Sequence, residues 1–109
     1  MIPNDVYKAF VVTGTDWADK HGAAELLEGT LKSLKAQYTL EAKRSESCSM
    51  AEAETIALSC GDYRDAVAAS VAARTEANRA RVKYEATKAL FEAQRTAEAS
   101  DRAAMRSAT

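Results

Sequence analysis

The sequence predicts an all-α protein, an elongated antiparallel helical hairpin or coiled coil with a very long C-terminal helix and two short accessory helices. Residues 62–106 contain neither Pro nor Gly, and Ala recurs at roughly every third position there. Residues 16–44 carry apolar side chains at alternating spacings of three and four, which is typical of a coiled coil. A chain of 109 residues is long enough for one domain. We therefore expect a single helical domain over residues 1–109.

The first accessory helix is predicted over residues 4–12. Asn4 is a suitable N-cap, and Asp5 favours the positive end of the helix dipole. Thr13 and Gly14 follow the last apolar residue, and Gly is common just past a helix end. The segment is therefore expected to end before Gly14.

The second helix, over residues 16–44, has the clearest apolar pattern in the chain. Trp17, Leu31 and Tyr38 belong to a column with a spacing of seven, and Leu27 and Leu34 lie between its members. This alternation predicts the seam along which the helix packs on a neighbour.

A second column of the same helix consists of small residues, Gly22, Gly29 and Ala36. Gly in a helix interior is about 1 kcal/mol less favourable than Ala. Two glycines on one column therefore suggest that another backbone approaches closely there.

The connection begins with a polar loop over residues 45–49. Ser49 and Glu52 have the spacing of a capping box, which predicts a short helix over residues 50–59. Gly61 is expected to end that helix, and Asp62 is expected to cap the long helix over residues 62–106.

The long helix has Tyr84, Phe91 and Met105 on one heptad column. If it returns antiparallel along the second helix, Trp17 should lie near Phe91. Residues 92–106 would then extend beyond the partner helix, which makes them a candidate surface for self-association or for a protein partner.

Composition and charge exclude several classes of protein. The formal net charge is −1, so there is no overall polyanion-binding signature. We expect no signal peptide, because no basic segment followed by an apolar run begins the chain, and no apolar stretch reaches membrane-spanning length. The expected location is the cytoplasm. Cys48 and Cys60 are then expected to be reduced thiols, with a disulfide between them as the alternative.

Catalytic and metal-binding patterns are missing from the sequence. His21 is the single histidine, and a lone helical His is more often a partly buried polar residue than a base or a ligand. No nucleophile motif, metal-ligand spacing or phosphate-binding loop is present. We expect a protein that is not an enzyme and that uses no cofactor, no metal ion and no small-molecule substrate.

Basic residues form a row with a spacing of seven on the long helix, beside Tyr84 and Phe91. The row consists of Arg74, Arg81, Lys88, Arg95 and Arg102. Cations beside aromatic rings are what a single-strand DNA binder needs. Glu85, among other glutamates, lies at helical contact distance from these cations, which is also the pattern of a salt-bridged coiled-coil flank. The existing heptad pattern favours the second interpretation.

The part of the basic row with the fewest nearby carboxylates is the candidate contact for DNA or for an acidic partner. That part is Arg74 and Arg81 of the row together with the neighbouring Arg79 and Lys83, and Lys88 is included in the candidate contact.

Two segments carry a resemblance to a known group. They are Thr15-Asp16-Trp17-Ala18-Asp19-Lys20-His21, continuing to Glu28, and Phe91-Glu92-Ala93-Gln94-Arg95, continuing to Arg106. The chain resembles small helical proteins encoded by tailed phages and prophages near their recombination and replication genes. The resemblance implies a phage protein in the host cytoplasm that acts in DNA metabolism or on host machinery. It assigns no functional residue.

Three functions follow as hypotheses. The first is a non-enzymatic accessory factor in phage DNA recombination or replication, which binds a protein partner or single-stranded DNA through the long helix. The second is an inhibitor of a host defence or regulatory protein. The third is a purely structural component of an assembly. In each, we expect a homo-oligomer, because a chain this small can bury only a marginal core by itself.

Overall fold

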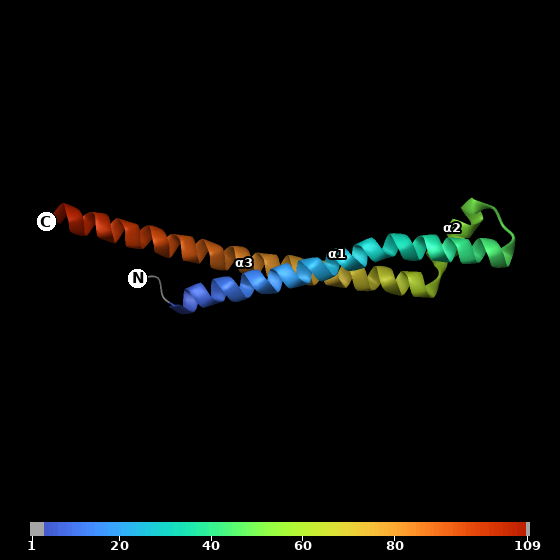
Figure 1. Ribbon diagram of the computed structural model, residues 1–109, viewed down its shortest axis with the longest axis horizontal. Helices are drawn as coiled ribbons and strands as arrows, with labels where there is room; N and C mark the ends of the chain where they lie inside the picture. Colours follow the sequence, from blue (N-terminus) through green and yellow to red (C-terminus); the bar gives the residue numbers. More distant parts are fainter. Residues whose placement is uncertain (1–3, 109) are drawn as a thin grey trace. The chain divides into compact units, whose positions relative to one another are not determined.

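The computed structural model describes residues 4–108 and contains three α-helices (Figure 1). They are α1 (Asn4–Glu46), α2 (Met50–Ser59) and α3 (Gly61–Ala108). The described residues contain no strand, so the predicted all-α class is confirmed. The predicted very long C-terminal helix is confirmed as well, because α3 has 48 residues.

The predicted break between residues 12 and 16 is wrong, because α1 continues through it. A glycine commonly ends a helix by adopting a left-handed conformation, and no glycine in the described chain has a positive φ. The hydroxyl of Thr13 donates to the carbonyl of Ala9 (2.8 Å), within the same helix. Gly14 instead lies against Tyr84, whose Cε1 atom would be 3.0 Å from a Cβ at position 14. The glycine therefore makes room for a ring.

The predicted start of α2 is confirmed. The backbone N–H of Glu52 donates to Oγ of Ser49 (3.2 Å), as the capping-box spacing indicated. The predicted end of α2 at residue 59 is confirmed as well, whereas α3 begins one residue before its predicted start at residue 62. Cys60 caps the C-terminal end of α2, and Gly61 is already the first residue of α3, with Asp62 in its first turn.

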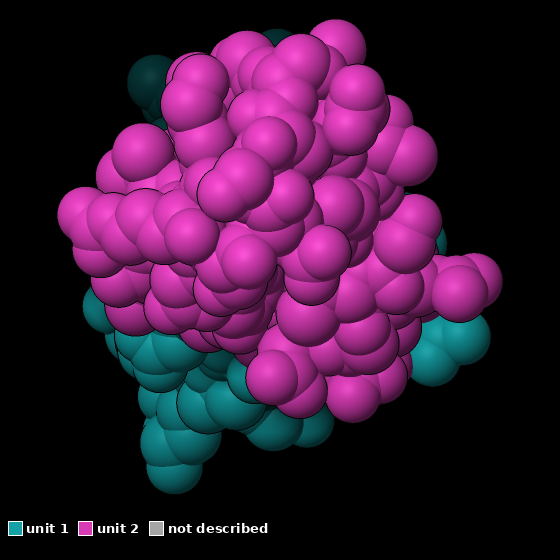
Figure 2. Space-filling view, turned by 90° about the vertical axis from the view of Figure 1, so that its right-hand side faces the viewer, with its two compact units in different colours: residues 1–19, 77–109 teal, residues 20–76 magenta. Residues whose placement is uncertain are grey.

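The chain divides into two compact units, where we expected one domain (Figure 2). Unit 1 comprises residues 1–19 and 77–109, and unit 2 comprises residues 20–76. Each unit contains one segment of α1 and one segment of α3, and unit 2 also contains α2.

Unit 1 is held together by aromatic rings. Phe10 stacks on Phe91, with 4.9 Å between ring centroids, and Trp17 stacks on Tyr84 at 5.3 Å. Phe10 also contacts Tyr84 (5.5 Å), and Tyr7 contacts Phe91 (6.3 Å). As residue numbers rise along α1, their partners fall along α3, so the two segments are antiparallel, as a hairpin requires.

The register of the hairpin differs from the expected one by nearly two helical turns. Trp17 stacks on Tyr84, which precedes Phe91 by seven residues. In unit 2, Tyr38 lies near the start of α3. There, burial and the nearby charge of Asp62 raise the pKa of the Tyr38 phenol. Within unit 2, the last turns of α1 therefore extend past the first residue of α3.

The overhang of α3 within unit 1 is shorter than expected, because α1 continues without a break from Asn4. Phe91, Gln94 and Glu98 are half-buried, whereas residues 99–108 are all exposed. Figure 1 shows α3 continuing past the start of α1. The uncovered end begins near residue 99 and not at residue 92, because the first turns of α1 cover the difference.

The buried core of the described chain is made of small side chains. The buried apolar residues are Ala24, Ala42, Ala53, Ala57, Ala77 and Ala80, and no large side chain is fully buried. Burying a Leu or Phe side chain stabilises a fold by about 1.5–3 kcal/mol, and a single methyl group contributes far less. The close helix packing that alanines permit is therefore weakly stabilised within one chain.

Candidate interaction surfaces

The predicted seam residues fall into two groups in the structure. Those that are half-buried are Trp17, Leu31, Leu34, Tyr38, Tyr84 and Phe91. Leu27 lies at the margin of the seam, with 37% of its surface exposed, and Met105 is 71% exposed on the uncovered end of α3. The structure brings Trp17 and Tyr84 together but leaves Met105 without a neighbouring helix in unit 1. Phe10 belongs to the same column, seven residues before Trp17, and the expected helix break hid that spacing.

Tyr84 and Phe91 are already engaged within unit 1. Each ring contacts two other aromatic rings, and the Arg95 guanidinium lies over Phe91 at 6.0 Å from its centroid. Stacking of a nucleic acid base needs an exposed aromatic face. The two rings that the sequence placed beside the basic row therefore serve packing in this fold.

Arg74 is the centre of a charged network in unit 2. Its Nε donates to Oε2 of Glu28 (3.0 Å), and its Nη2 donates to Oε1 of the same carboxylate (2.6 Å). A third nitrogen, Nη1, donates to Nδ1 of His21 (3.0 Å). The imidazole therefore accepts at Nδ1, and its Nε2 faces Oε1 of Glu25 at 3.0 Å. Sequence reasoning did not identify Glu28, because it lies 46 residues from Arg74.

The electrostatics of this pair follow from its geometry. The bidentate hydrogen bond from Arg74 lowers the pKa of the Glu28 carboxyl below its ordinary value of 4.5. The same bond raises the pKa of the Arg74 guanidinium. Arg74 is only 29% exposed. Its charge is thus neutralised inside the chain, which removes the first member of the predicted nucleic-acid contact from easy access.

The remaining members of that contact are on the surface of α3. Arg81, Lys83 and Lys88 are exposed, and Arg79 is exposed as well but takes part in a further interaction within the chain. A contact of these cations with nucleic acid or with an acidic partner stays a prediction.

The two cysteines are free and half-buried among the described residues. Cys48 lies near the end of α1, with Sγ 3.9 Å from the carbonyl oxygen of Ala42. Within residues 4–108, no group of three or more His, Cys, Asp or Glu side chains is arranged to hold a metal ion. None of the described helices is long and apolar enough to cross a membrane.

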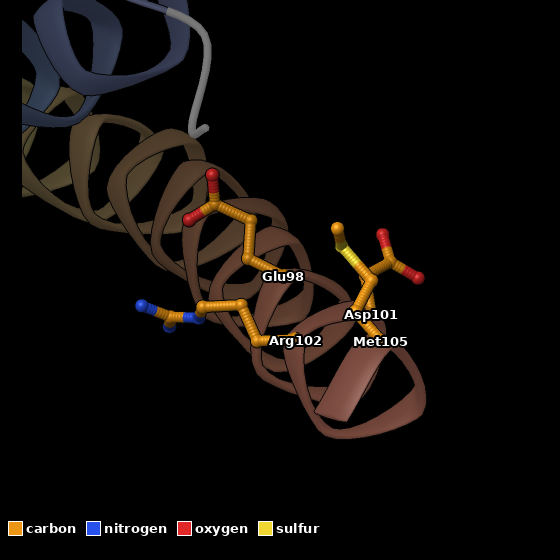
Figure 3. Close-up of a pocket in the computed structure, with 4 residues that line it drawn as sticks. All are labelled: Glu98, Asp101, Arg102 and Met105. Carbon is orange, nitrogen blue, oxygen red and sulfur yellow. The ribbon is translucent and has the colours of Figure 1, made fainter. Parts of the chain in front are cut away.

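The end of α3 has a shallow recess of about 380 Å³ (Figure 3). Glu98, Asp101, Arg102 and Met105 line it, all from the same helix. In Figure 3, these side chains point in different directions and do not converge on one point. A ligand site usually needs enclosing walls and convergent polar groups. The recess therefore has the character of an open helix surface.

A second hollow, of about 390 Å³, lies in unit 2 between α1 and α2. Ala36 and Leu40 of α1 and Met50 of α2 contribute its apolar lining, and Lys32 and Glu54 lie among its charged residues. Leu40 and Met50 are about half-exposed. This hollow is an apolar groove that faces outward from the hairpin.

The column of Gly22, Gly29 and Ala36 continues from this groove along the outer face of α1. We expected a neighbouring backbone at these glycines, and that expectation is wrong for the single chain. No other part of the described chain lies within 4 Å of a Cβ placed at Gly22 or Gly29. The reason is that the seam of α1 faces α3, whereas this column lies on the opposite side of the helix. Leu26, on the same side, is 71% exposed.

Comparison with protein-family models finds no match, and the searches of curated proteins and of solved structures find none either.

Proposed function

We propose that the chain is a non-enzymatic helical interaction protein that works as a homo-oligomer and contacts a protein partner through its exposed helix faces. The observation that carries this proposal is a contrast in side-chain size: the buried apolar residues are small, and large apolar residues are exposed. The buried apolar residues are alanines, while Leu26, Leu40, Val71 and Met105 are exposed. A small chain with such a core gains stability by burying its large side chains against another chain.

The exposed area supports the same proposal. The chain has a mass of 11.8 kDa and exposes 7757 Å². A monomeric protein of that mass typically exposes about 5,900 Å². The difference, about 1,800 Å² by these figures, is of the size that one subunit buries in an obligate dimer.

Association with single-stranded DNA is the second candidate, because Arg81, Lys83 and Lys88 are exposed on α3. The engagement of Tyr84 and Phe91 within unit 1 favours a protein partner over DNA. Following the sequence resemblance, we propose a phage accessory role in DNA recombination or replication as the setting. Inhibition of a host protein is the alternative setting, and a purely structural assembly is the third.

Concentration-dependent unfolding tests the oligomer. Because association stabilises the folded state by mass action, Tm should rise as protein concentration increases from the micromolar to the millimolar range. Sedimentation equilibrium should give a mass above 11.8 kDa. A concentration-independent Tm together with a monomeric mass would overturn the proposal.

A DNA-binding measurement separates the two candidate partners. If DNA is the partner, the chain binds single-stranded oligonucleotides with an affinity that falls steeply with salt. Arg81→Glu with Lys83→Glu should then abolish binding, whereas Arg64→Glu in unit 2, also exposed, should not. No binding at low salt rejects DNA and leaves the protein-partner proposal.

A further inference from the structure

The outer face of α1 carries a second heptad pattern, opposite the seam that packs on α3. Its members recur at alternating spacings of four and three, the spacing of a helix-pairing surface. They are Gly22, Leu26, Gly29, Ser33, Ala36 and Leu40. All six are exposed. This pattern is not part of the seam with α3, and its last two members, Ala36 and Leu40, border the groove between α1 and α2.

We propose that this outer face is the contact between two copies of the chain, with their α1 helices antiparallel. The inference rests on the proposed function, because it names the surface through which the homo-oligomer forms. A second copy is the occupant because the face is complementary to itself in size and in charge.

The size complementarity appears when α1 is placed antiparallel to its own copy. In the register that sets Leu26 opposite Ala36 of the second copy, Leu40 lies opposite Gly22 of the second copy. Ser33 then lies opposite Gly29 of the second copy. Every layer pairs a leucine with a small residue or two small residues, so the helix backbones can approach closely.

In the same register, the layer that follows Leu40 and Gly22 pairs two opposite charges. Asp19, one turn before Gly22, then lies opposite Lys43 of the second copy, and both side chains are exposed on α1. A parallel, in-register pair would instead place Asp19 beside its own copy and Lys43 beside its own copy. Like charges placed opposite each other are unfavourable. The charges therefore favour the antiparallel arrangement.

The groove between α1 and α2 completes the contact. Leu40 and Ala36 line its α1 side, and Met50 stands beside them from α2. Gly22 of the second copy, lacking a side chain, would lie against Leu40 in this groove. Close approach of a second copy would also account for Gly22 and Gly29. Each glycine destabilises an isolated helix, and within the described chain no other part lies within 4 Å of a Cβ placed at either position.

Sedimentation equilibrium of the full-length chain and its variants tests the surface. Leu26→Glu with Leu40→Glu should raise the dimer Kd at least about 100-fold, because four of the six layers of the antiparallel pair would then bury charges. The matched control is Val82→Glu with Leu90→Glu, two equally exposed apolar residues on α3, which should leave Kd within about threefold.

Gly29→Leu is a second variant, which tests the same surface with a substitution that should not unfold the single chain. Leucine favours the helix, and the single chain has room for it, so helix content should not decrease. The same side chain would separate the two α1 backbones, and Kd should rise by a similar factor. Retained dimerisation in Gly29→Leu and in the double α1 variant would overturn the α1 surface while leaving the proposed oligomer intact.

Distance measurement between spin labels tests the direction of the helices. A label at Glu41→Cys, with Cys48 and Cys60 replaced by Ser, should be displaced from its copy by about 30 Å along the helix axis. A parallel pair would hold the labels side by side, about one helix spacing of 8–10 Å plus the label arms apart. That short distance would overturn the antiparallel contact. A wild-type chain that stays monomeric would overturn the proposed function together with this inference.

Discussion

Arg74 and Glu28 form a bidentate ion pair between α3 and α1 in unit 2, with N–O distances of 3.0 and 2.6 Å. The planar guanidinium matches both carboxylate oxygens, so this contact sets the local alignment of the two segments as well as their attraction. Arg74 is also one of the predicted DNA-contact residues, and in the structure its guanidinium is paired with a carboxylate of the same chain.

Acid should weaken unit 2 through Glu28. Its pKa is lower in the folded chain than its ordinary value of 4.5. Its contribution is therefore complete above pH 4.5 and is lost as the pH falls through the lower, folded-state pKa. Urea unfolding at pH 6 and pH 3 should show a larger loss of stability for the wild type than for Glu28→Gln. Equal losses in both proteins would contradict the role of the ion pair.

Gly14→Ala should destabilise unit 1, although Ala is the better helix former. Its Cβ would be 3.0 Å from Cε1 and 3.3 Å from Cδ1 of Tyr84, and that ring is held by Trp17 and Phe10. We expect a net loss of about 1 kcal/mol, because overpacking exceeds the gain in helix propensity. Thermal unfolding measures it.

The background variant Tyr84→Leu makes this test specific. With the ring removed, Gly14→Ala should become neutral or stabilising, so the two changes should not be additive. Equal effects of Gly14→Ala in both backgrounds would show that the ring is not the cause.

Phe91→Ala should loosen the start of α1. Phe91 contacts Phe10 and Tyr7, and its removal takes away two ring contacts from a half-buried position. We expect a loss of about 2 kcal/mol. Hydrogen exchange should accelerate in residues 4–19 and stay unchanged in residues 24–42. Its exposed neighbour provides the control, since Leu90→Ala should change stability by no more than about 0.5 kcal/mol.

Ser49→Ala should fray α2. The Ser49 hydroxyl accepts the Glu52 amide, and loss of such a cap typically costs about 1 kcal/mol. Amide exchange in residues 50–59 measures the effect. Ser59→Ala removes a hydroxyl that donates to the Thr55 carbonyl within the helix, and it should leave exchange nearly unchanged. Similar exchange rates in the two variants would argue against the cap.

Much of the fold could be predicted from local patterns. The capping-box spacing located the start of α2, and the column through Trp17, Leu31 and Tyr38 identified the side of α1 that packs on α3. These features depend on neighbours within a few turns of the same helix. Periodicity and capping are therefore sufficient to reveal them.

The sequence by itself determined the helical class, the long C-terminal helix and the apolar face of each helix, because these depend on side chains a few residues apart. Tertiary structure decided which glycine is needed, which cation is neutralised and where the hairpin register lies. From the sequence alone, Gly14 is predicted to end a helix and Arg74 is predicted to be a surface cation. In the fold, Gly14 packs against Tyr84, and Arg74 forms an ion pair with Glu28. In each case the partner is distant along the chain, and only the alignment of α1 with α3 brings the two residues together.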